Sequence, residues 1–174
     1  MTQIFEPERV YLLRKQGSGL SLGELVDHTW ADERPELEQA CVYIALVNSA
    51  GEIYIQHRAA TKRLWSNRKT ISASGHVDPG ETFEQAAVRE AREELGIGLS
   101  EDGLRLIGSF TGLPHCGPVY EVRSDATPKP NPTELDARRS GFVVVAELGR
   151  WLSEPDLFTP SGARALSLWM ANRK

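Results

Sequence analysis

The sequence predicts an α/β fold, because patterns typical of buried strands and of helices both recur along the chain. Residues 40–48 form a continuous apolar run rich in Val and Ile, which is typical of a buried strand. Residues 83–95 have helical apolar spacing, and Thr82 before them begins a capping-box pattern. A last helix is expected over residues 161–172, where several apolar side chains share one face.

The remaining elements are predicted from short apolar runs separated by Gly, Pro and other turn residues. The strand that follows the long apolar run is expected to pair with it as a hairpin. In chain order we expect strands at 9–14, 23–29, 40–48, 53–58, 71–75, 104–112, 119–123 and 141–146, with a Gly-Ser-Gly turn at 17–19. Loops are expected at 31–38, at the basic stretch 59–70 and at the proline-rich stretch 124–132, and a short helix at 147–152.

Length and charge narrow the classes of function. The chain has 174 residues, which suits one domain with one substantial core. Its formal net charge is −4 and it has no Lys/Arg-rich block, so we expect no nucleic-acid partner. A small anionic substrate is compatible with this charge, because a few cations or metal ions can reverse the sign inside one pocket.

The sequence also predicts a cytoplasmic protein with no membrane partner. Residues 1–10 include acidic side chains and lack the apolar core of a signal peptide. No stretch approaches the roughly 18 consecutive apolar residues needed to span a bilayer. The two cysteines, Cys41 and Cys116, do not form a metal-binding pattern or a disulfide framework, so a reducing compartment fits.

The first of the two long helices carries a concentration of carboxylates. Glu90, Glu93 and Glu94 fall within one arc of roughly 100°, because each residue turns the helix by about 100°. They repel one another, and the helix dipole disfavours anions so late in the helix. Hard divalent cations would offset this cost, and Mg²⁺ prefers carboxylate oxygens. The alternative is a solvated acidic face partly paired with Arg89 and Arg92. The adjoining arc, expected to pack on the sheet, consists of Phe83, Ala87, Ala91 and Leu95.

The segment from residue 75 to 97, GHVDPGETFEQAAVREAREELGI, resembles the signature of the Nudix family, the Nudix box. That signature is Gly, five residues, Glu, seven residues, then R-E-U-x-E-E-x-G-U with U aliphatic. The GHVDPGE stretch, Trp65 upstream and the extra strand pair at 9–29 further resemble the branch related to isopentenyl-diphosphate isomerase. The fixed places are filled by Gly75, Glu81, Arg89, Glu90, Ala91, Glu93, Glu94, Gly96 and Ile97.

The resemblance implies a specific architecture, a mixed β-sheet sandwiched between helices in an α/β/α arrangement. It also implies that residues 1–174 form a single Nudix domain. Within it we expect an N-terminal strand pair at 1–38, a Nudix core at 39–150 and a C-terminal helix at 160–172.

The resemblance also assigns roles to residues of the box. Glu90, Glu93 and Glu94 are the expected ligands of Mg²⁺, with Mn²⁺ as the alternative ion, and the backbone carbonyl of Gly75 is a further candidate ligand. Glu81 and Arg89 are expected to pair and to steady the loop against the helix.

The chemistry that follows is hydrolysis of a phosphoanhydride, with water attacking phosphorus. Glu93 is the expected general base, and Glu134, in the segment before the last strand, is the rival. A solvated loop acid is the plainer interpretation of Glu134. Arg58 and Lys69 are the candidate phosphate contacts, although each could equally be a surface charge.

Two other functions are weighed against hydrolysis. An isopentenyl-diphosphate isomerase, as we align that family, has a catalytic Cys immediately before the box glycine, where this chain has Ser74. A binding module without turnover usually has lost box glutamates, and this chain keeps them. The substrate class stays open among nucleoside di- or triphosphates and nucleoside diphosphates linked to another moiety, and the protein is expected to be a monomer or homodimer.

Overall fold

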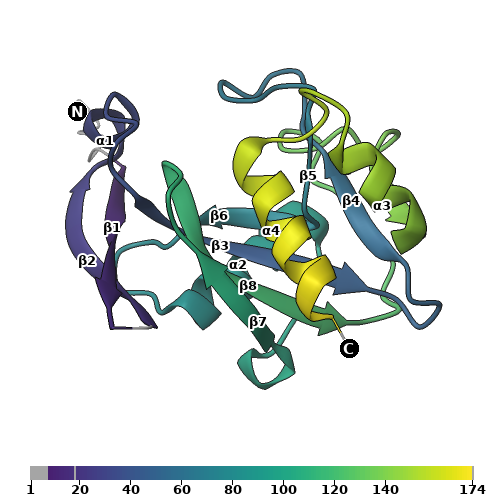
Figure 1. Ribbon diagram of the computed structural model, residues 1–174. Helices are drawn as coiled ribbons and strands as arrows, with labels where there is room; N and C mark the ends of the chain where they lie inside the picture. Colours follow the sequence, from purple (N-terminus) through teal and green to yellow (C-terminus); the bar gives the residue numbers. More distant parts are fainter. Residues whose placement is uncertain (1–7, 18, 174) are drawn as a thin grey trace, which may run out of the picture.

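The computed structural model of the protein, which describes residues 8–17 and 19–173, contains one sheet with helices on both of its faces (Figure 1). The strands are β1 (Arg9–Gln16), β2 (Gly19–Asp27), β3 (Gln39–Val47), β4 (Ile53–His57), β5 (Lys69–Thr70), β6 (Ala73–His76), β7 (Arg105–Phe110), β8 (His115–Arg123) and β9 (Gly141–Val143). The helices are α1 (His28–Asp32), α2 (Phe83–Leu95), the short 3-10 turn η1 (Glu101–Gly103), α3 (Val145–Leu152) and α4 (Pro160–Asn172).

Strand β3 is the centre of the sheet. All nine of its residues are buried, as its continuous apolar sequence predicts for a strand covered on both faces. It pairs in parallel with β8, where Tyr43 lies opposite Val119, and antiparallel with β6, where Val42 lies opposite Gly75. The sheet is therefore mixed, and β3 brings the start of the Nudix-like segment next to strands that are distant in sequence.

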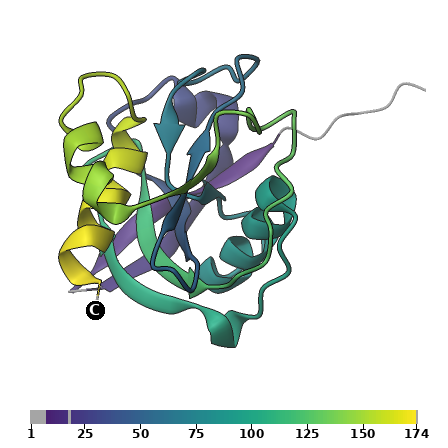
Figure 2. The same ribbon diagram turned by 90° about the vertical axis from the view of Figure 1, so that its right-hand side faces the viewer.

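The two faces of β3 supply two separate hydrophobic cores. Even-numbered residues such as Ile44 pack in the cluster with Ala87 and Leu95 of α2. Odd-numbered residues such as Tyr43 pack in the cluster with Leu166 and Trp169 of α4, which also includes α3. Figure 2 shows α2 and the pair α3–α4 on opposite sides of the sheet. The predicted α/β class and sandwich arrangement are confirmed.

Helix α2 has the limits that its end signals predict. The Thr82 hydroxyl accepts a hydrogen bond from the Gln85 backbone N–H at 3.2 Å, and the Gln85 side chain accepts one from the Thr82 N–H at 3.0 Å. Gly96 ends the helix in the left-handed conformation, with φ of 65°, which glycine adopts without steric cost. The buried side of the helix also includes Glu90 and Glu94.

Several predicted elements differ in detail from the structure. The loop expected at 31–38 begins inside α1, because the Asp27 side chain caps a helical turn that starts at residue 28. The hairpin expected between β3 and β4 is limited to one pair at the turn, Val47 opposite Ile53. Strand β4 then diverges and pairs with β5 and β9. The last strand is shorter than predicted, since α3 starts at Val145 and places apolar side chains in the core.

Two predictions fall partly on residues outside the described ranges. The turn at 17–19 includes Ser18, and the N-terminal segment used to argue against a signal peptide includes residues 1–7. Among the described residues, β1 and β2 pair antiparallel on either side of that turn. No helix in the described part of the chain combines the length and the apolar character needed to cross a membrane.

Helix α4 is attached to the sheet by a buried charge. The Glu121 carboxylate, 2% exposed, accepts hydrogen bonds from Trp169 Nε1 at 2.8 Å and from Arg123 Nε at 3.1 Å. Arg105 Nη2 lies 3.0 Å from the same carboxylate. Burial alone raises the pKa of Glu121, but these donors together outweigh burial and hold the pKa below its ordinary value.

We therefore expect Trp169→Phe to lower the free energy of unfolding near neutral pH by about 1.5–3 kcal/mol, because a buried carboxylate loses one donor. The depressed folded-state pKa means that this stabilisation is present above the ordinary value of 4.5 and is lost as pH falls through the folded value. The effect of Trp169→Phe should therefore shrink in acid. Urea unfolding at several pH values measures it. Trp30→Phe, at a side chain 42% exposed, is the control and should change stability by less than about 0.5 kcal/mol.

Candidate functional site

A cavity of about 770 Å³ is lined by the predicted box residues Gly75, Arg89, Glu90, Glu93 and Glu94, whereas Glu81 is not among the described residues of its lining. The walls come from β3, β6, the start of β8, α1, α2, the start of α4, the loop between β4 and β5, and the segment before β9. This volume is in the range of cavities that enclose a small organic ligand. Its ionisable lining consists of carboxylates Glu8, Asp78, Glu90, Glu93, Glu94 and Glu134, cations Arg58, Lys62, Arg63 and Arg89, and the side chains of Cys41, Tyr43, His28, His76 and His115.

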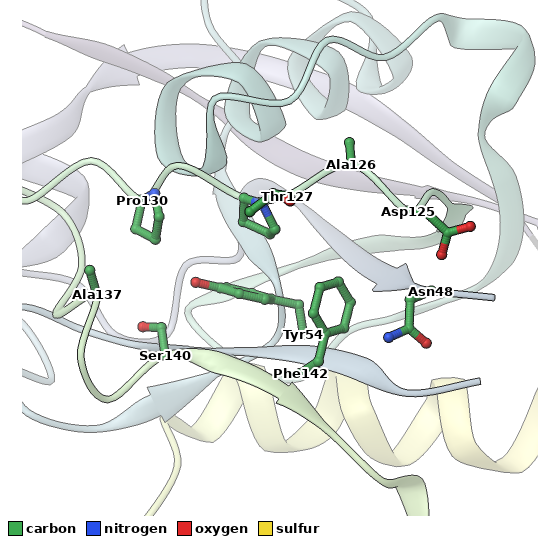
Figure 3. A pocket seen from close by; sticks show the side chains of 10 residues that line it. Asn48, Tyr54, Asp125, Ala126, Thr127, Pro130, Ala137, Ser140 and Phe142 are labelled. Atoms are coloured by element: carbon green, nitrogen blue, oxygen red, sulfur yellow. The ribbon is translucent and has the colours of Figure 1, made fainter. Parts of the chain in front are cut away.

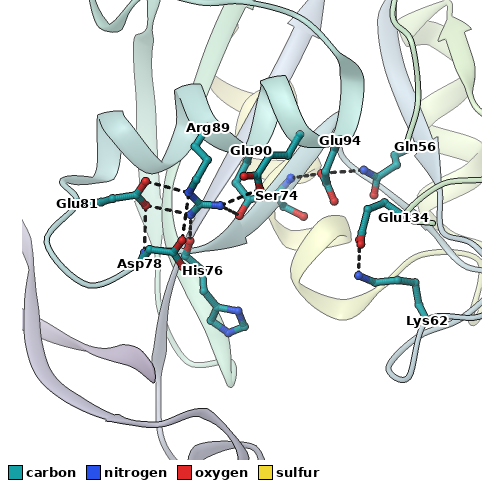
Figure 4. A network of polar contacts seen from close by, with 11 residues as sticks. Gln56, Lys62, Ser74, His76, Asp78, Glu81, Arg89, Glu90, Glu94 and Glu134 are labelled. Carbon is teal, nitrogen blue, oxygen red and sulfur yellow. Dashed lines mark hydrogen bonds and ion pairs between the residues drawn. The ribbon is translucent and has the colours of Figure 1, made fainter. Parts of the chain in front are cut away.

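Glu94 is a buried carboxylate held by two neutral donors. One of its oxygens accepts hydrogen bonds from Gln56 Nε2 on β4 and from the Ser74 backbone N–H on β6, both at 2.9 Å (Figure 4). Burial, and then the neighbouring Glu90, raise the pKa of this carboxyl group above its ordinary value. A negative charge at this position is therefore costly unless a further positive group is added.

Glu90 lies against the backbone of Gly75. A Cβ atom at position 75 would come within 2.0 Å of Glu90 Oε1, so a side chain there would displace the Glu90 carboxylate. Burial raises the pKa of Glu90, although the adjacent Arg89 opposes that shift. The glycine of the box thus makes room for a carboxylate on the cavity wall.

Arg89 links the loop before α2 to the carboxylates of the helix. Its Nε and Nη2 contact the two oxygens of Glu81 at 2.9 and 3.0 Å, which is the pair that the family resemblance implied. Its Nη1 contacts Glu90 at 2.6 Å and Glu93 at 3.2 Å, and Nη2 also donates to the carbonyl of His76 at 2.8 Å (Figure 4). A single guanidinium therefore fixes three glutamates and the end of β6.

The remaining two predicted acids differ in their surroundings. The Glu93 side chain is 57% exposed. Its one partner among the described residues is Arg89 Nη1, which also contacts Glu90. Glu134 forms an ion pair with Lys62 of the basic loop, as Figure 4 shows. Its backbone carbonyl accepts a hydrogen bond from the Ala59 N–H at 2.9 Å, which joins the segment before β9 to the basic loop. The structure thus brings Glu134 into the cavity that the box glutamates line.

The donor chemistry of the cavity fits a hard divalent cation. Carboxylate oxygens of Glu90, Glu93 and Glu94 are the ligand type that Mg²⁺ and Mn²⁺ prefer. Gln56 Oε1 is buried beside Glu94 without a hydrogen-bond partner among the described residues. Within the described part of the chain, no three His, Cys, Asp or Glu side chains are already gathered as a cation site. The carboxylates are instead paired with Arg89, Gln56 and Ser74, so loading requires side-chain rearrangement.

The two predicted phosphate contacts lie in different places. Arg58 lines the cavity, and its Nε and Nη2 donate to the Leu64 carbonyl at 3.2 and 3.0 Å. Lys69 is not among the described residues that line the cavity, and its ammonium lies 4.8 Å from the ring centre of Trp151. Substrate binding by Lys69 therefore stays a prediction, and the position of its ammonium beside Trp151 does not favour it.

Sequence reasoning missed several residues of the site. Lys62 was noted only as part of a basic stretch, and Gln56 only as part of a strand. The alternation of β4 is the signal that could have placed Gln56 on one face with Tyr54. Asp32 lies at the end of α1, and nothing in the local sequence distinguished it from a loop acid.

The proline-rich loop covers a second, smaller cavity of about 370 Å³. Its floor consists of Tyr54 on β4 and Phe142 on β9, whose ring centres are 5.4 Å apart, and Pro130 faces them (Figure 3). Its one carboxylate is Asp125, whose Oδ1 already accepts from the Ser49 backbone N–H. This cavity therefore offers an aromatic surface without a cluster of acids.

Comparison with known proteins identifies the family. Residues 37–167 match the NUDIX domain. A protein of Deinococcus radiodurans named Nudix hydrolase is 38% identical over 116 residues, which span 64% of this chain and 61% of that protein. An isopentenyl-diphosphate Δ-isomerase of Nocardia farcinica is 35% identical over 137 residues, or 72% of this chain and 75% of that protein. The crystal structure of DR0079 from Deinococcus radiodurans has a TM-score of 0.76 and 30% identity, covering 96% of this chain and all of that one.

We expect Mg²⁺ to change how stability depends on pH. Because the folded-state pKa values of Glu90 and Glu94 are raised, the metal-free fold binds more protons than the unfolded chain above the ordinary value of 4.5. Metal-free stability should therefore fall as pH rises from about 4.5 to above neutral. Saturating Mg²⁺ should remove most of this fall, since binding favours the ionised form. Thermal unfolding with EDTA or Mg²⁺ between pH 5 and 8.5 measures both curves. Parallel curves would contradict the assignment of these carboxylates as ligands.

Proposed function

The chain belongs to the Nudix family, and on this premise we propose that it hydrolyses a phosphoanhydride bond by attack of water at phosphorus. The substrate class is a nucleoside di- or triphosphate, or a nucleoside diphosphate linked to another moiety. The observation that carries the proposal is the set of four glutamates, Glu90, Glu93, Glu94 and Glu134, around one cavity large enough for such a molecule. We further propose a cytoplasmic protein, monomeric or homodimeric, without nucleic-acid or membrane partners.

Nudix hydrolases generally use divalent metal ions, and we propose Mg²⁺, or alternatively Mn²⁺, held by Glu90, Glu93 and Glu94 with the Gly75 carbonyl. When bound, the cation offsets the diphosphate charge and makes the attacking water more acidic. The chain's own contribution is to hold the carboxylates in place. Gln56 and Ser74 orient Glu94, and Arg89 orients Glu90 and the preceding loop.

Glu93 is the proposed general base. It is the most exposed of the box carboxylates assigned here, so it can reach a water in the cavity, and its described partner is one guanidinium. Glu134 is the second candidate. The Glu134 side chain is 30% exposed against 57% for Glu93, and this greater access to solvent favours Glu93.

Arg58 and Lys62 are the proposed phosphate contacts. Both line the cavity that the glutamates share, and both can present N–H donors to phosphate oxygens. Lys62 currently neutralises Glu134, so an arriving diphosphate would compete with that carboxylate for the ammonium.

Isomerisation of isopentenyl diphosphate is the alternative activity, favoured by the relatives of that name. The chain has Ser74 where that family's catalytic Cys is expected, and the Ser74 backbone N–H already donates to Glu94. A serine hydroxyl is a far weaker acid than a thiol and is a poor substitute in proton transfer. We therefore expect no conversion of isopentenyl diphosphate to its isomer, measured by product chromatography with Mg²⁺ present. Detectable conversion that Ser74→Ala abolishes would replace the hydrolase proposal.

The direct test is release of phosphate or nucleoside monophosphate from a panel of nucleotides and nucleotide conjugates. We expect Mg²⁺-dependent turnover in the wild type, and a fall in kcat of about 10²–10⁴ in Glu93→Gln, the range for loss of a general base. Glu147→Gln, at an exposed acid of α3, which packs on the other face of the sheet and does not line the cavity, is the matched control and should keep wild-type kcat.

The pattern across variants separates the remaining possibilities. Full activity of Glu93→Gln with loss in Glu134→Gln would move the base to Glu134. Absence of turnover across the panel, with Mg²⁺ binding intact, would favour a protein that binds nucleotides without cleaving them. That last outcome would sink the hydrolase proposal for these substrate classes.

A further inference from the structure

Three imidazole rings gather in the same cavity as the glutamates. His28 begins α1, His76 ends β6 and His115 begins β8, and all three line the cavity. The ring centre of His76 is 4.7 Å from that of His28 and 5.3 Å from that of His115. These three side chains, called here the histidine wall, come from separate elements and have no role in the hydrolysis described above.

The hydrogen bonds behind the wall fix which nitrogen of His76 carries its hydrogen. Gln39 Nε2 donates to Asp32 Oδ1 at 3.1 Å, so the amide oxygen of Gln39 faces the other way. That oxygen lies 2.9 Å from His76 Nε2 and can only accept, so His76 Nε2 is the donor. In the neutral ring Nδ1 is then an acceptor, and no group among the described residues donates to it.

Asp32 anchors this arrangement from α1. Its side chain is 8% exposed and forms an ion pair with Arg63 of the basic loop. Its Oδ1 also lies 3.4 Å from His28 Nε2 and 3.9 Å from His115 Nε2. Both His28 and Asp32 precede residues 37–167, the part that matches the NUDIX domain. The histidine wall is therefore partly built by residues that precede the part of the chain matching the NUDIX domain.

We propose that the histidine wall binds an uncharged, hydroxyl-bearing group attached to the substrate's diphosphate, with His76 Nδ1 accepting a hydrogen bond from one of its hydroxyls. The proposal rests on the hydrolase function above and narrows its substrate class to nucleoside diphosphates joined to a sugar or polyol. A further phosphate group would bind poorly at the histidine wall. Glu8 and Asp32 place carboxylates beside it, and His76 Nδ1 has no hydrogen to donate to an anion.

The test compares substrates that differ only in the group beyond the diphosphate. The probes are ADP-ribose, ADP-glucose and the β-phosphate methyl ester of ADP, which have the same nucleoside and the same diphosphate charge. For the wild type we expect kcat/KM for at least one sugar conjugate to exceed that of the methyl ester by tenfold or more, mainly through KM. His76→Phe keeps a ring but removes the acceptor, so that ratio should fall about three- to tenfold. Because each ratio is taken within one variant, a general loss of activity cancels.

Gln39→Met provides a second variant that leaves His76 itself in place. It removes the acceptor that fixes the Nε2–H form, so Gln39 acts as a positioning residue. We expect the ¹⁵N NMR signals of His76 to report Nε2–H in the wild type and a mixture of ring forms in Gln39→Met, with a reduced sugar preference. Thr29→Ala, at an exposed position on α1 beside His28, is the control and should leave the ratio unchanged.

Failure of this proposal is distinguishable from failure of the hydrolase function. Equal kcat/KM for the three probes in the wild type, or an unchanged ratio in His76→Phe, would overturn the histidine-wall proposal while hydrolysis stands. If no probe is cleaved, calorimetric dissociation constants give the same ratios without turnover. A sugar preference in binding that His76→Phe removes supports the wall, and equal dissociation constants overturn it.

Discussion

The burial of two carboxylates against strand β6 is the constraint on which the rest of the site depends. Glu90 and Glu94 lie on the packed side of α2, where an unpaired charge is costly. Gly75 leaves the space that Glu90 occupies, and Gln56 and Ser74 provide donors to Glu94. Ser74 and Gly75 are adjacent on β6 and Gln56 is on β4, so the correct placement of these two strands is a condition for tolerating the acids.

Strand β3 provides that order. It is buried on both faces and places β6 and β8 on its two sides, which sets the position of α2 relative to the sheet. Helix α4 closes the opposite face through Trp169, whose indole donates to the buried carboxylate of Glu121. An apolar core therefore holds each helix layer on the sheet. Helix α4 is held in addition by the hydrogen bond from Trp169 to the buried carboxylate of Glu121.

In the proposed function, the Nudix box carries the reaction, and segments outside the box take part in substrate recognition. The Nudix box supplies the carboxylates and Arg89, which contacts Glu81, Glu90 and Glu93 and holds them in position. The loop between β4 and β5 supplies three cations, Arg58, Lys62 and Arg63, of which Lys62 is paired with Glu134 before β9 and Arg63 with Asp32 on α1. A substrate that fills the cavity meets the reactive groups of the family together with a wall to which the N-terminal segment contributes.

The sequence by itself determined the box, the limits of α2, the central buried strand and the clustering of Glu90, Glu93 and Glu94, because these follow from spacing within one segment. Tertiary structure alone decided which distant side chains meet them. Gln56 reaches Glu94, Lys62 reaches Glu134, and Asp32 reaches Gln39, and these partners are 38, 72 and 7 positions apart in the sequence. It also separated Lys69 from the cavity and turned β4 away from β3 after one pair. Local periodicity fixes which face a side chain takes on its own element, whereas the neighbour it meets depends on how strands pair across the whole sheet.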